Sequence, residues 1–296
     1  MKKLLALTAV LATLTVAGCG SAGATDVPES TTTEAASGDI AVVSREEGSG
    51  TRSAFEELVG IDEEHQLTEA ALVQNGNGPV AMFVETNPAA IGYVSFSTLA
   101  EKDGIRGIKV DGVEPTEANV LAGDYALSRP FVLVYDENKA GEADLAFIKF
   151  LESDEGMATL KDHGAIVDMS TAEPFDMDAF DPKMAGDLRL GGSTSTESAI
   201  IAVVETFTAL FPNVNYTYDS TGSGAGIKNA QDGTYSIGFS SREVDDSEVG
   251  AGIVVDTFCK DGIAIVVKNG NALEDISKEQ LLAIFTGEKT SWDDLK

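Results

Sequence analysis

The stretch VVSREEGSGT, residues 42–51, joins a short apolar run to a turn rich in glycine and hydroxyl groups, and the pattern that follows is helical. A strand, turn and helix in this order bring free backbone N–H groups, the positive end of a helix dipole and hydroxyls to one point, where an anion can bind. Arg45 stands directly before the turn and can offer paired N–H donors to a tetrahedral oxyanion, and Glu47 is placed to orient it. The segment therefore predicts part of an anion-binding site.

Two further segments share this design. LGGSTST, residues 190–196, precedes a long helical pattern, and STGSGAG, residues 220–226, precedes a shorter one. Any one such segment is weak support for a site, because Ser and Thr often cap helices and Gly is common in turns. Three of them in one chain, one with an arginine before the turn, favour a shared anion site.

The rest of the chain alternates short β-like runs with helical patterns, which predicts an α/β fold. We expect strands at residues 40–44, 89–94, 131–135, 188–190, 213–218, 235–239 and 262–267, and helices at residues 51–59, 143–151, 155–163, 196–211, 227–230 and 277–285. Residues 168–186 resemble a linker.

The N-terminus carries the pattern of an exported protein. A basic start at Lys2 and Lys3 and an apolar run over residues 4–16 are typical of a secretory signal peptide, and the run is too short to span a bilayer. Val16-Ala17-Gly18-Cys19 resembles the lipobox of bacterial lipoproteins, so we expect a signal peptide over residues 1–18 and a diacylated Cys19. The alternative is an ordinary signal peptide with an incidental cysteine. Residues 19–38 contain almost no large apolar side chain and predict a flexible tether.

Composition and charge exclude several classes of function. A hydrophobic content of 43% indicates a globular body, and a formal net charge of −29 argues against binding to nucleic acid or direct adsorption to anionic lipid. Cys259 has no partner once Cys19 is acylated, so we expect a buried free thiol and no disulfide. His65 and His163 lie in polar surroundings without metal-ligand spacing. Neither a nucleotide P-loop nor a G-x-S-x-G elbow occurs, and we expect no metal and no cofactor.

Eight short motifs resemble those of the phosphate-binding proteins of phosphate ABC transporters. They are SREEGSGT (44–51), AIGYVS (90–95), LSRP (127–130), GSTS (192–195), GSGAG (222–226), IGFSSR (237–242), DGIA (261–264) and IFTG (284–287). Together they extend over nearly all of residues 40–296. A chance likeness over such a length is implausible.

The order of the motifs departs from the usual pattern of that family. There the GSTS, GSGAG and SSR motifs come first, and the motif that matches SREEGSGT follows the FTG motif and a tryptophan. Joining Lys296 to Asp39 would restore the usual order, so the sequence predicts a circular permutation, which a fold tolerates when the original termini lie close together. A truncated tandem duplication is the alternative, although each motif occurs once.

The resemblance implies the fold of type II periplasmic binding proteins: two α/β lobes, each a sheet flanked by helices, two hinge crossovers, and a ligand in the cleft. One lobe would comprise residues 39–98 and 268–296 with the Arg-Ser-Gly-Thr loop, and the other residues 99–267 with the GSTS and GSGAG loops. The implied phosphate ligands are Arg45, Ser49, Gly50 and Thr51 from the first lobe and Thr194, Ser195, Ser223 and Ser241 from the second, supported by Glu47, Ser240 and Arg242. Well-known members of the family carry an aspartate where Ser241 stands, and a serine cannot repel sulfate as a carboxylate does.

The function implied by the resemblance is capture of inorganic phosphate for an ABC importer by an extracytoplasmic lipoprotein. Its expected partners are phosphate, a membrane-embedded permease and the bilayer, the last through Cys19, and we expect a monomer that catalyses no reaction. Three alternatives remain open from the sequence. They are a binder of sulfate, molybdate or another oxyanion, a surface enzyme acting on phosphoesters, and a sensor or scaffold without a transport role. The enzyme would need a metal cluster or a nucleophile and base, and the sequence offers neither pattern.

Overall fold

The computed structural model describes residues 36–295 of the chain. The expected signal peptide, Cys19 and most of the expected tether lie outside the described residues. Within residues 36–295, no helix combines the length and apolar character needed to cross a membrane.

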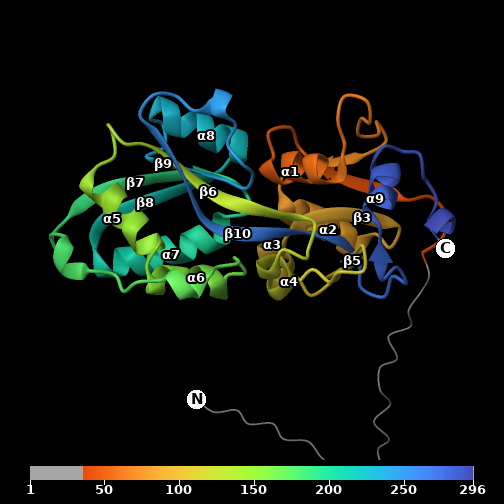
Figure 1. The fold of residues 1–296 in the computed structure, drawn as a ribbon, viewed down its shortest axis with the longest axis horizontal. Helices are drawn as coiled ribbons and strands as arrows, with labels where there is room; N and C mark the ends of the chain where they lie inside the picture. Colours follow the sequence, from red (N-terminus) through yellow and green to blue (C-terminus); the bar gives the residue numbers. More distant parts are fainter. Residues whose placement is uncertain (1–35, 296) are drawn as a thin grey trace, which may run out of the picture. The chain divides into compact units, whose positions relative to one another are not determined.

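The described chain folds into two α/β lobes that share one long strand (Figure 1). This strand, β10 (Ile253–Lys268), pairs antiparallel with β6 (Ser128–Asp136) in its first part and with β3 (Ala90–Ser95) in its last part. The combined sheet has the order β2-β1-β3-β10-β6-β9-β7-β8, with β4 also paired to β10. The strand expected at residues 262–267 is therefore only the last part of a longer element.

The first lobe holds the three strands that lie on one side of β10, together with β4. Its elements are β1 (Ala41–Arg45), α1 (Gly50–Val59), β2 (Leu72–Gln74), α2 (Asn77–Thr86), β3, α3 (Phe96–Ala100), β4 (Ile105–Gly107), β5 (Lys109–Val110), α4 (Glu117–Ala122), β11 (Asp275–Ile276), α9 (Lys278–Phe285) and the 3-10 helix η4 (Trp292–Leu295). In Figure 1, α1 and α9 cover one face of this sheet, and α2, α3 and α4 lie on the other.

The second lobe holds the four strands on the other side of β10. Its elements are β6, α5 (Glu142–Leu151), α6 (Asp154–Asp162), η1 (Met169–Thr171), η2 (Met177–Ala179), β7 (Ala185–Gly192), α7 (Glu197–Leu210), β8 (Asn213–Ser220), α8 (Ser223–Asp232), β9 (Ile237–Ser240) and η3 (Asp246–Glu248). Helix α8 covers one face of the sheet, and α5, α6 and α7 cover the other (Figure 1). Each lobe is thus a sheet flanked by helices on both faces, which confirms the expected α/β class.

The apolar cores correct the lobe boundaries expected at residues 98 and 268. Ile105, Val120 and Leu127 pack in the core of the first lobe, as do residues 263–267, whereas Phe131 and Phe258 belong to the core of the second. The chain therefore crosses between the cores near residues 127–131 and again near residues 259–263. The physical reason is that β4 pairs with the last part of β10, which keeps residues 105–127 on the sheet of the first lobe.

The two ends of the folded body meet at the edge of the first lobe. Asp39 forms an antiparallel bridge with Ser291, and the backbone N–H of Ile40 donates to the carbonyl of Thr290 at 2.7 Å. The indole Nε1 of Trp292 also donates to the carbonyl of Ala89, at 3.0 Å. This proximity is what a circular permutation requires.

Candidate functional site

The three predicted strand–turn–helix segments converge between the two lobes. The backbone N–H of Gly224, at the start of α8, donates to the carbonyl of Gly48 in the turn before α1, at 3.2 Å. The turn before α7 reaches the same place, because Thr194 accepts a hydrogen bond from Arg45 at 2.9 Å. The carboxyl ends of β1 and β7 and the turn after β8 therefore form one polar junction.

Arg45 is the largest fully buried side chain of this junction, with 1% of its surface exposed. Its Nη1 donates to Oδ1 of Asn77 at 2.8 Å, and its Nη2 donates to Oγ1 of Thr194 at 2.9 Å. Its Nε and Nη2 also donate to the two carboxylate oxygens of Glu46, both at 2.8 Å. The residue that orients Arg45 is thus Glu46, and the expectation for Glu47 is wrong. Glu47 is exposed on the turn.

A buried tyrosine fixes the strand end that carries Arg45. The hydroxyl of Tyr93 accepts from the backbone N–H of Arg45 at 3.3 Å and lies 2.8 Å from Oγ of Ser44. Its ring stacks on Phe55 of α1 with 4.1 Å between ring centroids. Burial raises the pKa of Tyr93 to about 12, so the phenol stays neutral and anchors β1 to α1 without adding charge.

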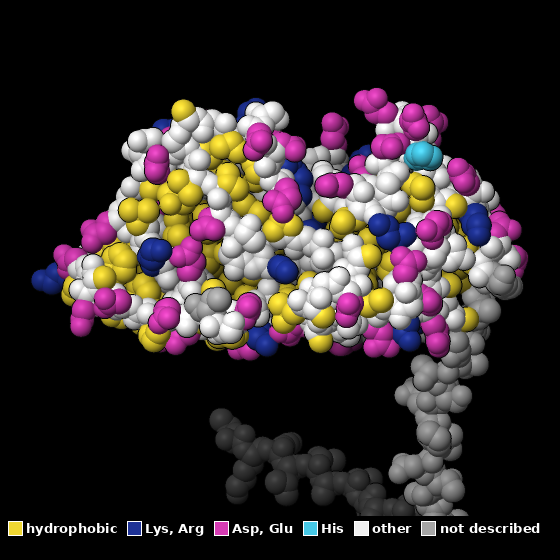
Figure 2. Space-filling view, in the orientation of Figure 1, with side chains coloured by type: hydrophobic (Ala, Val, Ile, Leu, Met, Phe, Trp, Pro, Cys, Tyr) yellow, Lys and Arg dark blue, Asp and Glu magenta, His cyan; other side chains and the backbone are white. Residues whose placement is uncertain are grey.

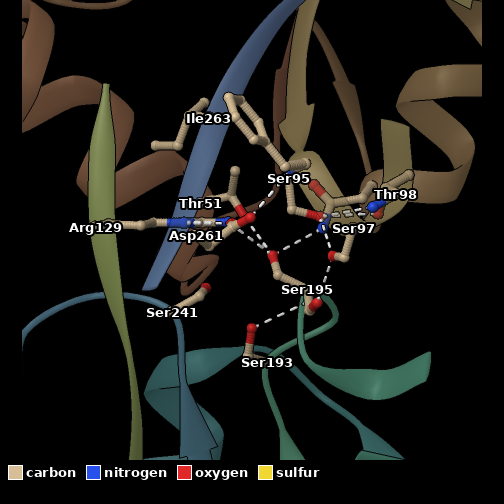
Figure 3. A network of polar contacts seen from close by, with 12 residues as sticks. Thr51, Ser95, Ser97, Thr98, Arg129, Ser193, Ser195, Ser241, Asp261 and Ile263 are labelled. Atoms are coloured by element: carbon tan, nitrogen blue, oxygen red, sulfur yellow. Dashed lines mark hydrogen bonds and ion pairs between the residues drawn. The ribbon is translucent and has the colours of Figure 1, made fainter. Parts of the chain in front are cut away.

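A hydroxyl network that includes Thr51 and Ser195 joins the two lobes (Figure 3). Oγ1 of Thr51 lies 2.9 Å from Oγ of Ser195, and the latter also accepts from Nδ2 of Asn77 and Nη2 of Arg129, both at 2.9 Å. A hydroxyl has two acceptor sites and one proton, so Ser195 must donate its proton to Thr51. The proton of Thr51 is then left to bind another acceptor.

Gly50 allows the lobes to approach at a second point of the junction. A Cβ at this position would lie 2.2 Å from Oγ of Ser223 and 2.8 Å from Oγ of Ser241. Those two serines are themselves linked, because the backbone N–H of Ser241 donates to Oγ of Ser223 at 3.0 Å. Only glycine fits between α1 and this serine pair.

Three of the expected site residues serve local structure. Oγ of Ser49 accepts from the backbone N–H of Arg52 at 3.2 Å and so caps α1. Ser240 hydrogen-bonds the backbone of Arg242 in a tight turn, and the guanidinium of Arg242 holds both carboxylate oxygens of Glu248, each at 2.7 Å. Arg242 therefore supports the turn after β9.

A second buried ion pair, between Arg129 and Asp261, borders the network and was not predicted from the sequence. Nε and Nη2 of Arg129 donate to Oδ2 of Asp261 at 3.0 and 2.7 Å, and both side chains are almost fully buried. Burial raises the pKa of Asp261 even though Arg129 lies beside it. Arg129 lies in the LSRP motif and Asp261 in the DGIA motif. A charged residue within an apolar strand could have indicated the ion pair, because buried charges need partners. Asn77 and Ser97 were also missed, and Ser97 donates to the carbonyl of Ser195 at 2.9 Å.

Charge is distributed very differently on the surface and at the junction. Figure 2 shows Asp and Glu side chains scattered over both lobes on the face that it draws. Of the four charged side chains that are buried within residues 36–295, two are arginines, Arg45 and Arg129, and both lie at the junction. Glu46 and Asp261 balance them, so an anion there would meet oriented donors in a locally neutral setting. No group of three or more His, Cys, Asp or Glu residues suited to a metal ion occurs among the described residues.

The fold consists of two lobes on a shared strand, and polar side chains of both lobes meet at one buried junction. This arrangement defines a two-lobed solute-binding protein. The sequence matches the model of the PBP superfamily domain over residues 24–155 and 180–296. It is 34% identical to the phosphate-binding protein PstS 2 of Streptococcus agalactiae serotype V over 100% of this chain and 98% of that protein. A crystal structure of a phosphate-binding protein of a phosphate ABC transporter from Streptococcus pneumoniae TIGR4 superposes with a TM-score of 0.69. That match has 34% identity and covers 88% of this chain and 100% of the other. The chain therefore belongs to the PBP superfamily and, within it, to the family of PstS phosphate-binding proteins.

The comparisons also bear on the order of the motifs. The match to PstS 2 runs along both chains from end to end, so that protein has its segments in the same order. In contrast, the phosphate-binding protein PstS of Bacillus subtilis matches over 115 residues, 38% of either chain, with 30% identity. This chain therefore shares the order of its segments with PstS 2.

Proposed function

We propose that this protein captures inorganic phosphate outside the cytoplasm for an ABC importer and catalyses no reaction. The observation that carries the proposal is the buried junction of donors from both lobes, centred on Arg45, Thr51 and Ser195, in a chain that matches PstS 2 along its whole length. The family to which the chain belongs is one of binding proteins. An oxyanion with four oxygens suits a site whose donors approach from several directions.

The proposed ligands of phosphate come from both sides of the junction. They are Arg45, Ser49, Gly50 and Thr51 of the first lobe and Thr194, Ser195, Ser223 and Ser241 of the second. Gly50 would act through its backbone N–H, and Thr51 through its backbone N–H as well as its hydroxyl, because the first turn of a helix leaves its N–H groups without intrahelical partners. Ser49 would contribute as the cap that fixes this helix terminus.

Binding of phosphate would hold the two lobes together. Arg45 now bonds to Thr194, and Thr51 to Ser195, so every one of these donors already faces the opposite lobe. An anion placed among them would accept from both sides at once, which favours the closed arrangement of a hinged protein. Fixed dipoles and the Arg45 guanidinium would supply the attraction, while the acidic surface is screened within about 8 Å at physiological salt.

Titration calorimetry of the purified protein, stripped of phosphate by unfolding and refolding, tests this function. We expect phosphate to bind with one site per chain, and sulfate and molybdate to bind more weakly. A protein that binds sulfate or molybdate more tightly than phosphate would be a transporter component for that oxyanion. A folded protein that binds none of the three would contradict an oxyanion-binding function.

The location at the membrane is a further part of the proposal. We infer that residues 1–18 are a lipoprotein signal peptide, that Cys19 is acylated, and that residues 19–38 tether the body as a monomer to the membrane surface. The support is the small-residue site Val16-Ala17-Gly18 directly before Cys19, and the composition of the tether. An anchored body of this kind would deliver phosphate to a permease in the same membrane.

A further inference from the structure

Arg129 occupies the hinge of the molecule. It is the second residue of β6, directly after the chain leaves the core of the first lobe at Leu127. Asp261 is its register partner on β10, two residues before that strand enters the first lobe at Ile263. Both crossings between the lobes therefore carry one member of this ion pair.

The ion pair fixes the direction in which the guanidinium points. Asp261 receives Nε and Nη2 of Arg129 on Oδ2, and its Oδ1 accepts from the backbone N–H of Phe96 at 3.1 Å. The ring of Phe131 lies under the guanidinium, with 5.7 Å from Cζ to the ring centroid. A guanidinium held along one edge by a carboxylate and supported by a ring has little freedom to turn.

The distal edge of the same guanidinium faces the hydroxyl network. Nη2 has a second N–H, which donates to Oγ of Ser195 at 2.9 Å, and Nη1 is its neighbour on this edge. Nη1 has no hydrogen-bond partner among the described residues, although Arg129 is only 5% exposed. The other two buried polar atoms without a partner in the described chain, Oδ1 of Asp144 and Nδ2 of Asn271, are not among the atoms of the junction. A buried N–H of a charged group without an acceptor is costly, and so it marks a place for one.

From this geometry we infer that Arg129 is a second anion-binding guanidinium, which donates to the bound oxyanion from the hinge through Nη1. Asp261 is a positioning residue that sets the direction of the guanidinium and balances its charge. The inference rests on the proposed phosphate function. It places donors on three sides of the anion: Arg45 and Thr51 on the first lobe, Ser195 on the second, and Arg129 on the strand pair that both lobes share. A donor on the hinge does not move with either lobe, so it is in place before the lobes close.

Phosphate titration of Arg129→Gln and Arg129→Lys tests the inference, with Arg106→Gln as the control. Arg106 is also a partly buried arginine held by hydrogen bonds, to the carbonyls of Asn271 and Leu273, but lies outside the junction. We expect Arg129→Gln to raise the Kd for phosphate by about tenfold or more, the loss typical of one charge-assisted hydrogen bond. Arg129→Lys keeps the charge but has no planar fork that could contact Asp261, Ser195 and an anion together, so its Kd should rise as well. Arg106→Gln should keep the Kd of the wild type.

A second readout separates direct contact from a structural role. A lost guanidinium contact should weaken binding of the phosphate dianion more than of the monoanion, so the effect of Arg129→Gln should be larger above the second ionisation of phosphate than below it. Equal effects at both pH values, or wild-type Kd values for both Arg129 variants, would overturn the inference. Failure of the wild type and of Arg106→Gln to bind phosphate would instead contradict the proposed function.

Discussion

Gly50 and Ser223 lie in such close contact across the two lobes that a single methyl group on Gly50 would stand 2.2 Å from the serine hydroxyl. We therefore expect Gly50→Ala to prevent full closure and to weaken phosphate binding. Inserting a methyl group into a packed site costs about 1–3 kcal/mol, which corresponds to a rise in Kd of about fivefold to a hundredfold. Calorimetry on the variant, with its melting temperature measured without phosphate, provides the check.

Gly224→Ala is the control for that substitution. Gly224 also faces the opposite lobe from α8, but its Cβ would lie 3.7 Å from the carbonyl oxygen of Gly48, an ordinary contact distance. Its Kd should match that of the wild type. Equal binding by Gly50→Ala and Gly224→Ala would show that the contact between α1 and α8 is not part of the bound state.

Glu46 and Glu47 are adjacent in sequence but should respond very differently to substitution. Glu46→Gln removes the charge that balances buried Arg45, and we expect the free energy of unfolding to fall by about 1–3 kcal/mol. Glu47→Gln changes an exposed side chain and should alter stability by no more than about 0.5 kcal/mol. Urea unfolding of both variants without phosphate measures the difference, and similar losses in the two would refute the assignment of Glu46 as the partner of Arg45.

The same carboxylate predicts a pH dependence of stability. Burial raises the pKa of Glu46, but the hydrogen bonds and charge of Arg45 outweigh burial and hold the pKa below its usual value of 4.5. A lowered pKa in the folded state contributes stability that is present above pH 4.5 and is lost as the pH falls through the folded value. The gap in unfolding free energy between wild type and Glu46→Gln should therefore be widest at neutral pH and shrink in acid. A gap that stays constant below pH 4.5 would mean that the pair does not titrate as the structure implies.

Ser241→Asp should sharpen the choice between phosphate and sulfate. Glu47 and Glu243 are exposed, and Glu46 and Asp261 are each held by an arginine, so none of these four carboxylates is free to repel a fully ionised anion. We expect sulfate to compete with phosphate at high excess in the wild type. The added carboxylate should weaken sulfate binding more than phosphate binding, because hydrogen phosphate can donate a proton to it.

Competition calorimetry with both anions at two pH values measures this selectivity, and Ser247→Asp adds the same charge at an exposed position as a control. The control should leave the ratio of the two affinities unchanged. Complete exclusion of sulfate by the wild type would show that discrimination has another source than the residue at position 241.

Cys19→Ser tests the proposed lipid anchor. The substitution removes the thiol that would be acylated, and we expect the protein to appear in the soluble fraction of fractionated cells or in the medium. Cys259→Ser is the matched control, because Cys259 is a buried free thiol in the second core, and that variant should stay with the membrane. Retention of Cys19→Ser in the membrane fraction would rule out acylation at this position as the anchor.

Local sequence signals predicted much of the fold. The strand and helix around the first motif were expected at residues 40–44 and 51–59 and lie at Ala41–Arg45 and Gly50–Val59, because an apolar run and a serine cap mark both ends. Helix α2 was missed because Gly78 and Pro79 usually interrupt helices. Here Pro79 lies in the first turn, where its missing N–H is not needed. The first part of β10 was missed because a register shift between Thr257 and Cys259 and the charged residues 260–261 break its apolar pattern.

The site was predicted as far as single segments allow. Each anion loop has its own motif, so the sequence identifies Arg45, Thr51 and Ser195 without knowledge of their contacts. The pairing of Arg129 with Asp261 joins residues 132 positions apart and depends on the register of two strands, which no local pattern encodes. Whether Glu46 or Glu47 pairs with Arg45 depends on the direction in which the Arg45 side chain leaves its strand.

The bridge between Asp39 and Ser291 holds the two ends of the folded body together, so the backbone forms a nearly closed loop with one opening. If these ends were joined and the backbone were opened at another exposed turn, every residue would keep the same spatial neighbours. The order of the segments in the gene and their arrangement in space are then independent of each other. Related proteins can therefore share every contact of the anion site although their genes begin with different segments of the fold.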